Sequence, residues 1–151
     1  MEISILFLPL AASIIAGFFG RYIGDRNSEI ITSVLVSISA FLSIFVLYQV
    51  IINQYEENIV IATWINSGSL DVNWSMMIDP LSAVMLVVVT SVSSLVHIYS
   101  IGYMSHDPHK PRFMAYLSLF TFAMLMLVTS DNFIQLFFGW EGVGLCSYFL
   151  I

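Results

Sequence analysis

A single carboxylate stands inside an otherwise uncharged, apolar stretch near the end of this chain. Glu141 lies within Phe133–Ile151, whose other residues carry no charge and are mostly apolar. An ionised acid in hydrocarbon costs several kcal/mol, so such residues are rare and usually mark paths for ions or protons. Desolvation favours the neutral acid, and an approaching cation favours the carboxylate. A residue in this setting is therefore suited to taking up and releasing a proton.

Three glycines and one histidine are the other residues that this chemistry could use. Gly139, Gly142 and Gly144 surround the acid, and they permit close helix packing, local distortion or a small hydrated cavity. His97 lies toward the inner end of an earlier apolar segment and could carry protons between Glu141 and the inner aqueous phase. The alternative for Glu141 is a hydrogen-bonded acid that never titrates, and for His97 an ordinary interfacial histidine.

The composition indicates a membrane protein. Apolar residues make up 59% of the 151 residues and charged residues 9%, whereas soluble domains have about 25% charged residues. The mean hydropathy is +0.93. Ten acids and four bases give a net charge of −6, too few bases for a nucleic-acid-binding face. Cys146 is the only cysteine, which excludes an internal disulfide and cysteine-based metal clusters.

Five apolar segments meet or approach the length of a membrane-spanning helix. Such a helix needs about 20 residues, and the fourth segment, with 16, is expected to borrow flanking residues. The first segment follows the acidic Glu2, where a signal peptide would carry positive charge, so we expect a retained helix. The fifth is still apolar at Ile151, which indicates truncation. The segments are Ile3–Gly20, Ile30–Ile52, Leu81–Ile101, Phe113–Val128 and Phe133–Ile151.

The basic residues predict the orientation of these helices. All four fall in the connections between the first and second segments and between the third and fourth, while residues 53–80 and 129–132 contain acids and no base. The positive-inside rule assigns the side with the bases to the cytoplasm or matrix, which leaves the amino terminus outside. The four bases are Arg21, Arg26, Lys110 and Arg112.

The loop Asn53–Asp79 is the one stretch long enough for structure outside the membrane. Before Asn66-Ser67-Gly68, Ile59, Ile61, Thr63 and Ile65 alternate with Val60, Ala62 and Trp64, and after it Leu70, Val72 and Trp74 alternate with Asp71 and Asn73. This period-two pattern around an Asn/Gly turn predicts a β-hairpin on the outer face. Trp64 and Trp74 are expected to pack against it at the level of the lipid headgroups.

Local signals mark several helix ends. Asp79-Pro80 suits the start of a helix, and Asp131-Asn132 suits a cap on the last one. The prolines at 108 and 111 prevent a continuous helix between the third and fourth segments. His106 and His109 have a spacing that a metal site could use, but a solvated turn is the simpler interpretation.

The chain resembles a known family at these motifs. Asp131-Asn132 followed by Leu136–Tyr148 (LFFGWEGVGLCSY) is similar to the signature of chain 5 of proton-pumping NADH:ubiquinone oxidoreductase, respiratory complex I. Asp79–Ser82 (DPLS) and His97–Met104 (HIYSIGYM) resemble the amino-terminal region of the same family. The resemblance covers the whole chain.

The resemblance implies a role in proton translocation coupled to NADH-to-quinone electron transfer. In this family the acid that matches Glu141 works opposite a lysine of a later helix. NADH, FMN, the iron–sulfur clusters and the quinone belong to other subunits, so this chain is expected to bind no cofactor or metal. The implied partners are other membrane-arm subunits and the lipid bilayer of a bacterial plasma membrane or mitochondrial inner membrane.

The expected fold class is an all-α polytopic membrane protein with five transmembrane helices, one outer-face β-hairpin and an incomplete antiporter-like bundle. Residues 1–130 form the amino-terminal helices, with the hairpin at 53–79, and residues 131–151 begin the antiporter-like proton-translocating domain. Two other functions stay open: a cation/proton antiporter subunit, in which the same acid serves exchange, and a non-catalytic truncated or split-subunit fragment.

Overall fold

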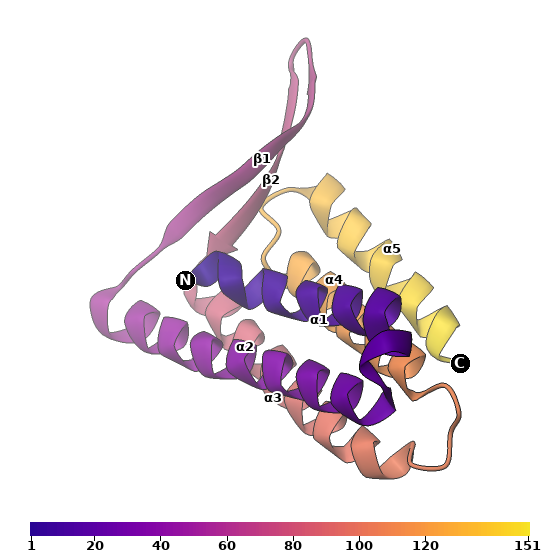
Figure 1. Cartoon of the computed structure of the whole chain (residues 1–151). Coiled ribbons are helices and arrows are strands. Elements are labelled where there is room, and N and C mark those ends of the chain that lie inside the picture. The colour runs from indigo at the N-terminus through magenta and orange to yellow at the C-terminus, as the bar shows by residue number, and fades with distance from the viewer.

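Five helices and one two-stranded antiparallel sheet make up the chain. A computed structural model describes residues 1–151, and Figure 1 shows the helices side by side with the hairpin extending beyond one end of the bundle. All five helices are long and apolar enough to cross a membrane, which confirms the five predicted spans. The elements are α1 (Glu2–Ile23), α2 (Asp25–Asn53), β1 (Glu57–Ser67), β2 (Leu70–Ile78), α3 (Pro80–Tyr103), α4 (Lys110–Val128) and α5 (Phe133–Leu150).

The helices extend into the polar flanks of the apolar segments. The fourth helix begins at Lys110 rather than at Phe113 and reaches 19 residues, and the second begins at Asp25. Backbone hydrogen bonds stabilise these turns whether their side chains face lipid or water, so a hydropathy boundary underestimates helix length. Only Gly24, with a φ of 89°, separates the first two helices, and this left-handed conformation suits glycine.

Side-chain caps fix the starts of α3 and α5 where the sequence indicated them. The Asp79 carboxylate accepts a hydrogen bond from the Ser82 amide at 2.6 Å, and the Asp79 amide donates to the Ser82 hydroxyl at 2.8 Å. Asn132 caps α5 by accepting from the Gln135 amide at 2.8 Å. Each cap satisfies backbone donors that the first helical turn leaves unpaired.

Buried hydroxyl groups join the packed helices. The α2 and α3 hydroxyls meet in two pairs, Ser37 with Ser94 at 2.8 Å and Ser43 with Thr90 at 2.7 Å. Each of these pairs includes a hydroxyl that also donates to a backbone carbonyl of its own helix. The hydroxyls therefore hydrogen-bond between the helices without needing water.

Large apolar side chains cover the outside of the bundle. Phe18, Phe41 and Leu81 are each more than 70% exposed, on three different helices. Soluble proteins rarely expose contiguous apolar surface of this extent. The outer surface of the five helices is thus suited to lipid, and the chain is a multi-pass membrane protein.

The predicted hairpin is confirmed, and it turns at Gly68 and Ser69. The strands pair from Ser67 opposite Leu70 down to Glu57 opposite Ile78, and Gly68 has a φ of 62°. The longer β1 strand has register shifts between Val60 and Ala62 and between Thr63 and Ile65. Such bulges increase the local twist of a ribbon.

Three aromatic rings connect the hairpin to α5. The ring centroids of Trp64 and Trp74 lie 5.3 Å apart, and each lies within 6 Å of Phe138 (5.9 and 5.0 Å) in an edge-to-face arrangement. This geometry is favourable for aromatic pairs beyond the area that they bury. The two tryptophans therefore pack the hairpin as predicted, with Phe138 of α5 as their third member.

Gln135 attaches α5 to the hairpin through a buried side chain. Its amide oxygen accepts from the Ser75 backbone N–H at 3.1 Å, and its amide nitrogen donates to the Ser75 carbonyl at 2.7 Å. The loop before α5 adds a backbone bond from the Met77 N–H to the Thr129 carbonyl at 2.8 Å. These bonds join residues 52 and 60 positions apart in sequence.

We predict that Gln135→Leu destabilises the protein by about 2–4 kcal/mol, because it leaves a buried N–H and a buried C=O of Ser75 without partners. Thermal unfolding of the purified full-length protein measures the loss. Gln49→Leu is the matched control, since Gln49 on α2 makes no side-chain hydrogen bond. Equal midpoints for the two variants would contradict a stabilising role for the Gln135 contact.

Candidate functional site

Glu141 is the ninth of the eighteen residues of α5. A rise of 1.5 Å per residue puts it about 12 Å from the first residue of the helix, near half the thickness of a bilayer core of about 30 Å. Its side chain is exposed, and no hydrogen bond or ion pair joins it to any other residue of the chain. The carboxylate therefore projects outward from the five-helix bundle at mid-depth.

The opposite face of α5 packs against α4. The buried residues of α5 are Gln135, Gly139 and Cys146, spaced four and seven positions apart along one stripe. Two residues turn an α-helix by about 200°, so Glu141 faces nearly away from Gly139. The packing of α5 on α4 thus sets the direction in which the acid points.

The glycines around Glu141 have two different environments. A Cβ built on Gly139 would lie 2.8 Å from the Leu127 Cβ and 2.9 Å from the Leu127 backbone, and one on Gly142 would lie 3.1 Å from the Ala123 Cβ. A Cβ on Gly144 would meet no atom within 4 Å. Gly139 and Gly142 therefore allow α5 to approach α4, whereas Gly144 lies beside open space.

His97 is completely buried on α3 and uses both ring nitrogens. Its Nδ1 lies 2.7 Å from the Ser93 carbonyl, and its Nε2 lies 3.0 Å from the Ser118 hydroxyl of α4. A carbonyl only accepts hydrogen bonds, so Nδ1 carries a proton and Nε2 of the neutral ring accepts from Ser118. The Ser93 hydroxyl continues the network to Thr121.

The structure does not bring His97 and Glu141 together. His97 lies at the contact between α3 and α4, where Ser118 and Thr121 face it. The α5 helix packs against a different face of α4, and Glu141 points away from that face. Within residues 1–151, no chain of hydrogen bonds connects the two residues.

A buried acid, Glu29, was missed by the sequence reasoning. It is 4% exposed on α2, and its Oε1 lies 4.0 Å from the Lys110 Nζ of α4 and has no hydrogen-bond partner. The sequence did offer one signal for this pair: Glu29 and Lys110 both fall at the same end of the predicted bundle. The pair lies at the basic end, far along α2 from the hairpin.

Asp131 belongs to the contact between the hairpin and the start of α5. Partial burial alone would raise the pKa of Asp131, but side-chain hydrogen bonds outweigh burial and hold this pKa below its usual value. Asn58 donates to its carboxylate at 3.0 Å and Asn132 donates at 2.6 Å. Asp131 therefore remains ionised and helps fix the hairpin over α5.

Fold and site together define a multi-pass helical membrane protein with one unpaired acid at the middle of an apolar helix. The family model for NADH-ubiquinone oxidoreductase (complex I), chain 5 N-terminus, matches residues 64–114. The chain is 57% identical over 151 residues to NADH-ubiquinone oxidoreductase chain 5 of Arabidopsis thaliana. It is 54% identical over 149 residues to the Phytophthora infestans chain 5. The chain belongs to the chain 5 family of NADH–ubiquinone oxidoreductase and corresponds to its amino-terminal portion.

The similarity is complete along this chain and partial along the relatives. All of the chain aligns with the Arabidopsis thaliana protein and 99% with the Phytophthora infestans protein. It spans only 23% and 22% of the lengths of these two relatives, respectively. The alignment with the first of them includes all predicted site residues of this chain.

We predict a graded response to alanine at the three glycines. Gly139→Ala should lower the free energy of unfolding by about 1–3 kcal/mol, because the new methyl group overlaps Leu127. Gly142→Ala should cost less, since the Ala123 methyl has room to shift by a few tenths of an ångström. Gly144→Ala should be neutral or slightly stabilising and serves as the control. Thermal unfolding of the full-length protein measures the series, and equal losses at all three positions would contradict the packing described.

Proposed function

We propose that this chain forms part of the membrane arm of a proton-translocating NADH:ubiquinone oxidoreductase, with Glu141 as a proton-binding group. The observation that carries the proposal is the unpaired carboxylate at the middle of α5, on a face that the other four helices leave uncovered. The names of the relatives support the redox-driven pump over the antiporter alternative.

A cation from outside these five helices would complete the site around Glu141. With no partner, a carboxyl group surrounded by apolar groups is most stable when it is protonated and neutral. A cation that approaches the uncovered face of α5 would stabilise the carboxylate, and the proton would leave. Movement of such a cation toward and away from Glu141 would therefore load and release one proton.

Gly144 contributes to the same face. It lies three residues after Glu141, about 60° away around the helix, and nothing of the chain occupies the space beside it. The absence of a side chain there leaves room for a neighbouring helix or for water to reach the carboxylate. The three glycines thus serve both sides of α5, two toward α4 and one beside the acid.

His97 is a secondary candidate for proton transfer. Its ring bridges α3 and α4 and joins the hydroxyl groups of Ser93, Ser118 and Thr121 in one buried network. A histidine can accept a proton at one nitrogen and release one from the other. We assign His97 to a proton path that is separate from Glu141 and lies toward the basic end of the bundle.

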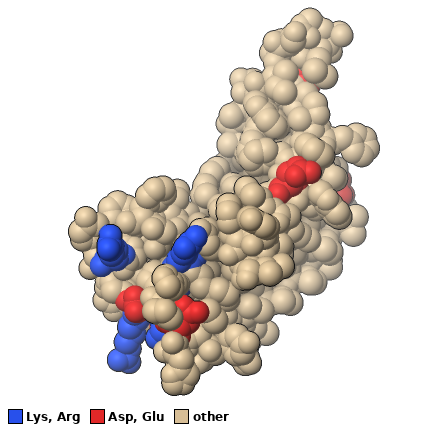
Figure 2. All heavy atoms as spheres, turned by 90° about the vertical axis from the view of Figure 1, so that its right-hand side faces the viewer, with Lys and Arg blue, Asp and Glu red and all other residues tan.

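The placement of charge supports the membrane orientation. The four basic residues lie at the end of the bundle opposite the hairpin, as Figure 2 shows for the blue spheres. By the positive-inside rule this end faces the cytoplasm or matrix, and the hairpin and the amino terminus face outward. The membrane is the energy-transducing inner membrane, and the partners are other membrane-arm subunits. NADH, FMN, iron–sulfur clusters and quinone are carried by those other subunits.

Glu141→Gln in the complete assembly should lower proton pumping by at least about tenfold where this step limits turnover, because glutamine keeps the shape but cannot carry a proton. Proton uptake by reconstituted vesicles during NADH oxidation measures the effect. Glu57→Gln, at an exposed acid of the hairpin, is the control and should pump normally. Normal pumping by a fully assembled Glu141→Gln enzyme would assign Glu141 a structural role.

His97→Gln should alter the pH dependence of coupled turnover while the amount of assembled enzyme stays the same. The reason is that glutamine can preserve a hydrogen bond to Ser118 without exchanging protons. The pH profile is compared with that of Ser118→Ala, which removes one hydrogen bond and keeps the ring. A lowered unfolding temperature with an unchanged pH profile would show that His97 acts in packing alone.

A further inference from the structure

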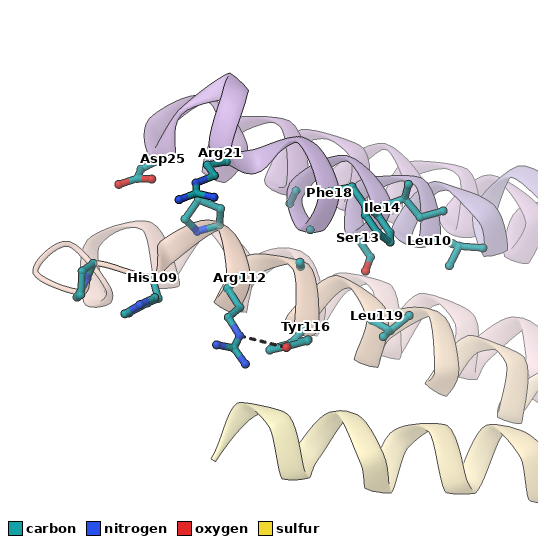
Figure 3. A pocket seen from close by; sticks show the side chains of 15 residues that line it. Leu10, Ser13, Ile14, Phe18, Arg21, Asp25, His109, Arg112, Tyr116 and Leu119 are labelled. Carbon is teal, nitrogen blue, oxygen red and sulfur yellow. Dashed lines mark hydrogen bonds between the residues drawn. The ribbon is translucent and has the colours of Figure 1, made fainter.

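A groove of about 830 Å³ runs between α1 and α4 and was not anticipated from the sequence. It begins among apolar side chains in the middle of the two helices and ends among polar ones at the basic end (Figure 3). One half is therefore suited to hydrocarbon and the other to a charged group. No residue proposed above for proton transfer lines it.

Small residues form the floor of the groove. Ala16 and Gly17 of α1 face Ala115 of α4, and a Cβ built on Gly17 would lie 3.6 Å from the Ala115 Cβ. Bulkier side chains, including Ile14 and Phe18, form the wall. This arrangement leaves an apolar groove beside a close helix contact, and its apolar lining is compatible with an acyl chain.

Two arginines stand at the polar end. Arg21 comes from the last turn of α1 and Arg112 from the first turn of α4. The Arg112 Nε donates to the Tyr116 hydroxyl at 3.1 Å, and its guanidinium lies 5.6 Å from the centroid of that ring. Figure 3 shows Arg21 extending from α1 toward the start of α4, and Arg112 extending from α4 beside Tyr116.

The charge at this end is not compensated within the chain. Lys110 lies within 4.0 Å of the Glu29 carboxylate, but neither arginine makes an ion pair with any acid of residues 1–151. Asp25 also lines the mouth, so the groove has two guanidinium groups and one carboxylate, a net charge of +1 from these three side chains.

We propose that this groove binds a membrane phospholipid with an anionic headgroup. The lipid phosphate lies between Arg21 and Arg112, and one acyl chain follows the small-residue floor past Ile14. Guanidinium groups match phosphate in charge and geometry, and basic sites between helices on the positive side of a membrane suit such headgroups.

Two observations favour a lipid over a protein segment. The apolar half of the groove is lined by Phe18, which is 77% exposed on the outer surface of the five helices. The cationic half lies at the end of the helices, at the depth of the headgroups. A lipid already has its charged and apolar parts at these two depths, so it can enter without burying an unpaired polar backbone.

The test uses the complete assembly, reconstituted in phosphatidylcholine vesicles with a photoactivatable phosphatidylglycerol whose reactive group is on the acyl chain. We expect cross-links to peptides that contain the groove residues of α1 and α4. Arg21→Gln with Arg112→Gln should lower this yield by at least about tenfold, a loss of 1.4 kcal/mol or more. Arg26→Gln, which removes one positive charge on the same side but outside the groove, should leave it unchanged.

A second variant separates headgroup binding from groove filling. Ile14→Trp should block the acyl chain and lower the yield while both arginines remain, and it is informative even if the double variant does not assemble. Equal cross-linking in the double variant and in Arg26→Gln would overturn the proposal, as would equal yield from a phosphatidylcholine probe. Cross-links from the groove to another protein helix, with none to lipid, would show instead that a protein segment occupies it.

Discussion

The rotation of α5 about its own axis is the constraint on which the account of this chain depends. One stripe of α5 meets α4 through Gly139 and Gly142, with distances that leave no room for larger side chains. At the hairpin end, the buried Gln135 amide pairs with both backbone groups of Ser75. A helix held at these points cannot turn freely, and Glu141 therefore faces away from the bundle at the middle of the span.

Most polar side chains between the helices are hydrogen-bonded and Glu141 is not, although the Ser33 hydroxyl and the Glu29 Oε1 also lack hydrogen-bond partners. Between α2, α3 and α4, hydroxyl groups and His97 bond to one another or to backbone carbonyls, so their burial costs little. Glu141 has no such partner in the chain. An acid in that position is expensive in lipid and becomes affordable when it is neutral or when another helix supplies a cation. The physical case for proton exchange rests on the contrast between this hydrogen-bonded network and an unpaired acid in the middle of α5.

Much of the fold was predictable because its signals are local. Long apolar runs predicted the five helices, and alternation around Gly68 predicted the hairpin. Counting residues along the apolar segment also placed Glu141 near the middle of α5, where the structure has it. Its direction was not predictable, because α5 is apolar on nearly every side and carries no amphipathic stripe. The Gln135–Ser75 and Glu29–Lys110 contacts were missed for a related reason, since each joins residues at least sixty positions apart.

The most direct test of the central claim is to follow the protonation state of Glu141 in the working enzyme. Infrared difference spectra of the complete assembly, recorded with and without NADH and quinone, would detect the C=O stretch of a protonated carboxyl group. The account predicts a band that changes with turnover and is absent when residue 141 is glutamine. A carboxylate that stays ionised, hydrogen-bonded to one fixed partner and unaltered while protons are pumped would contradict it.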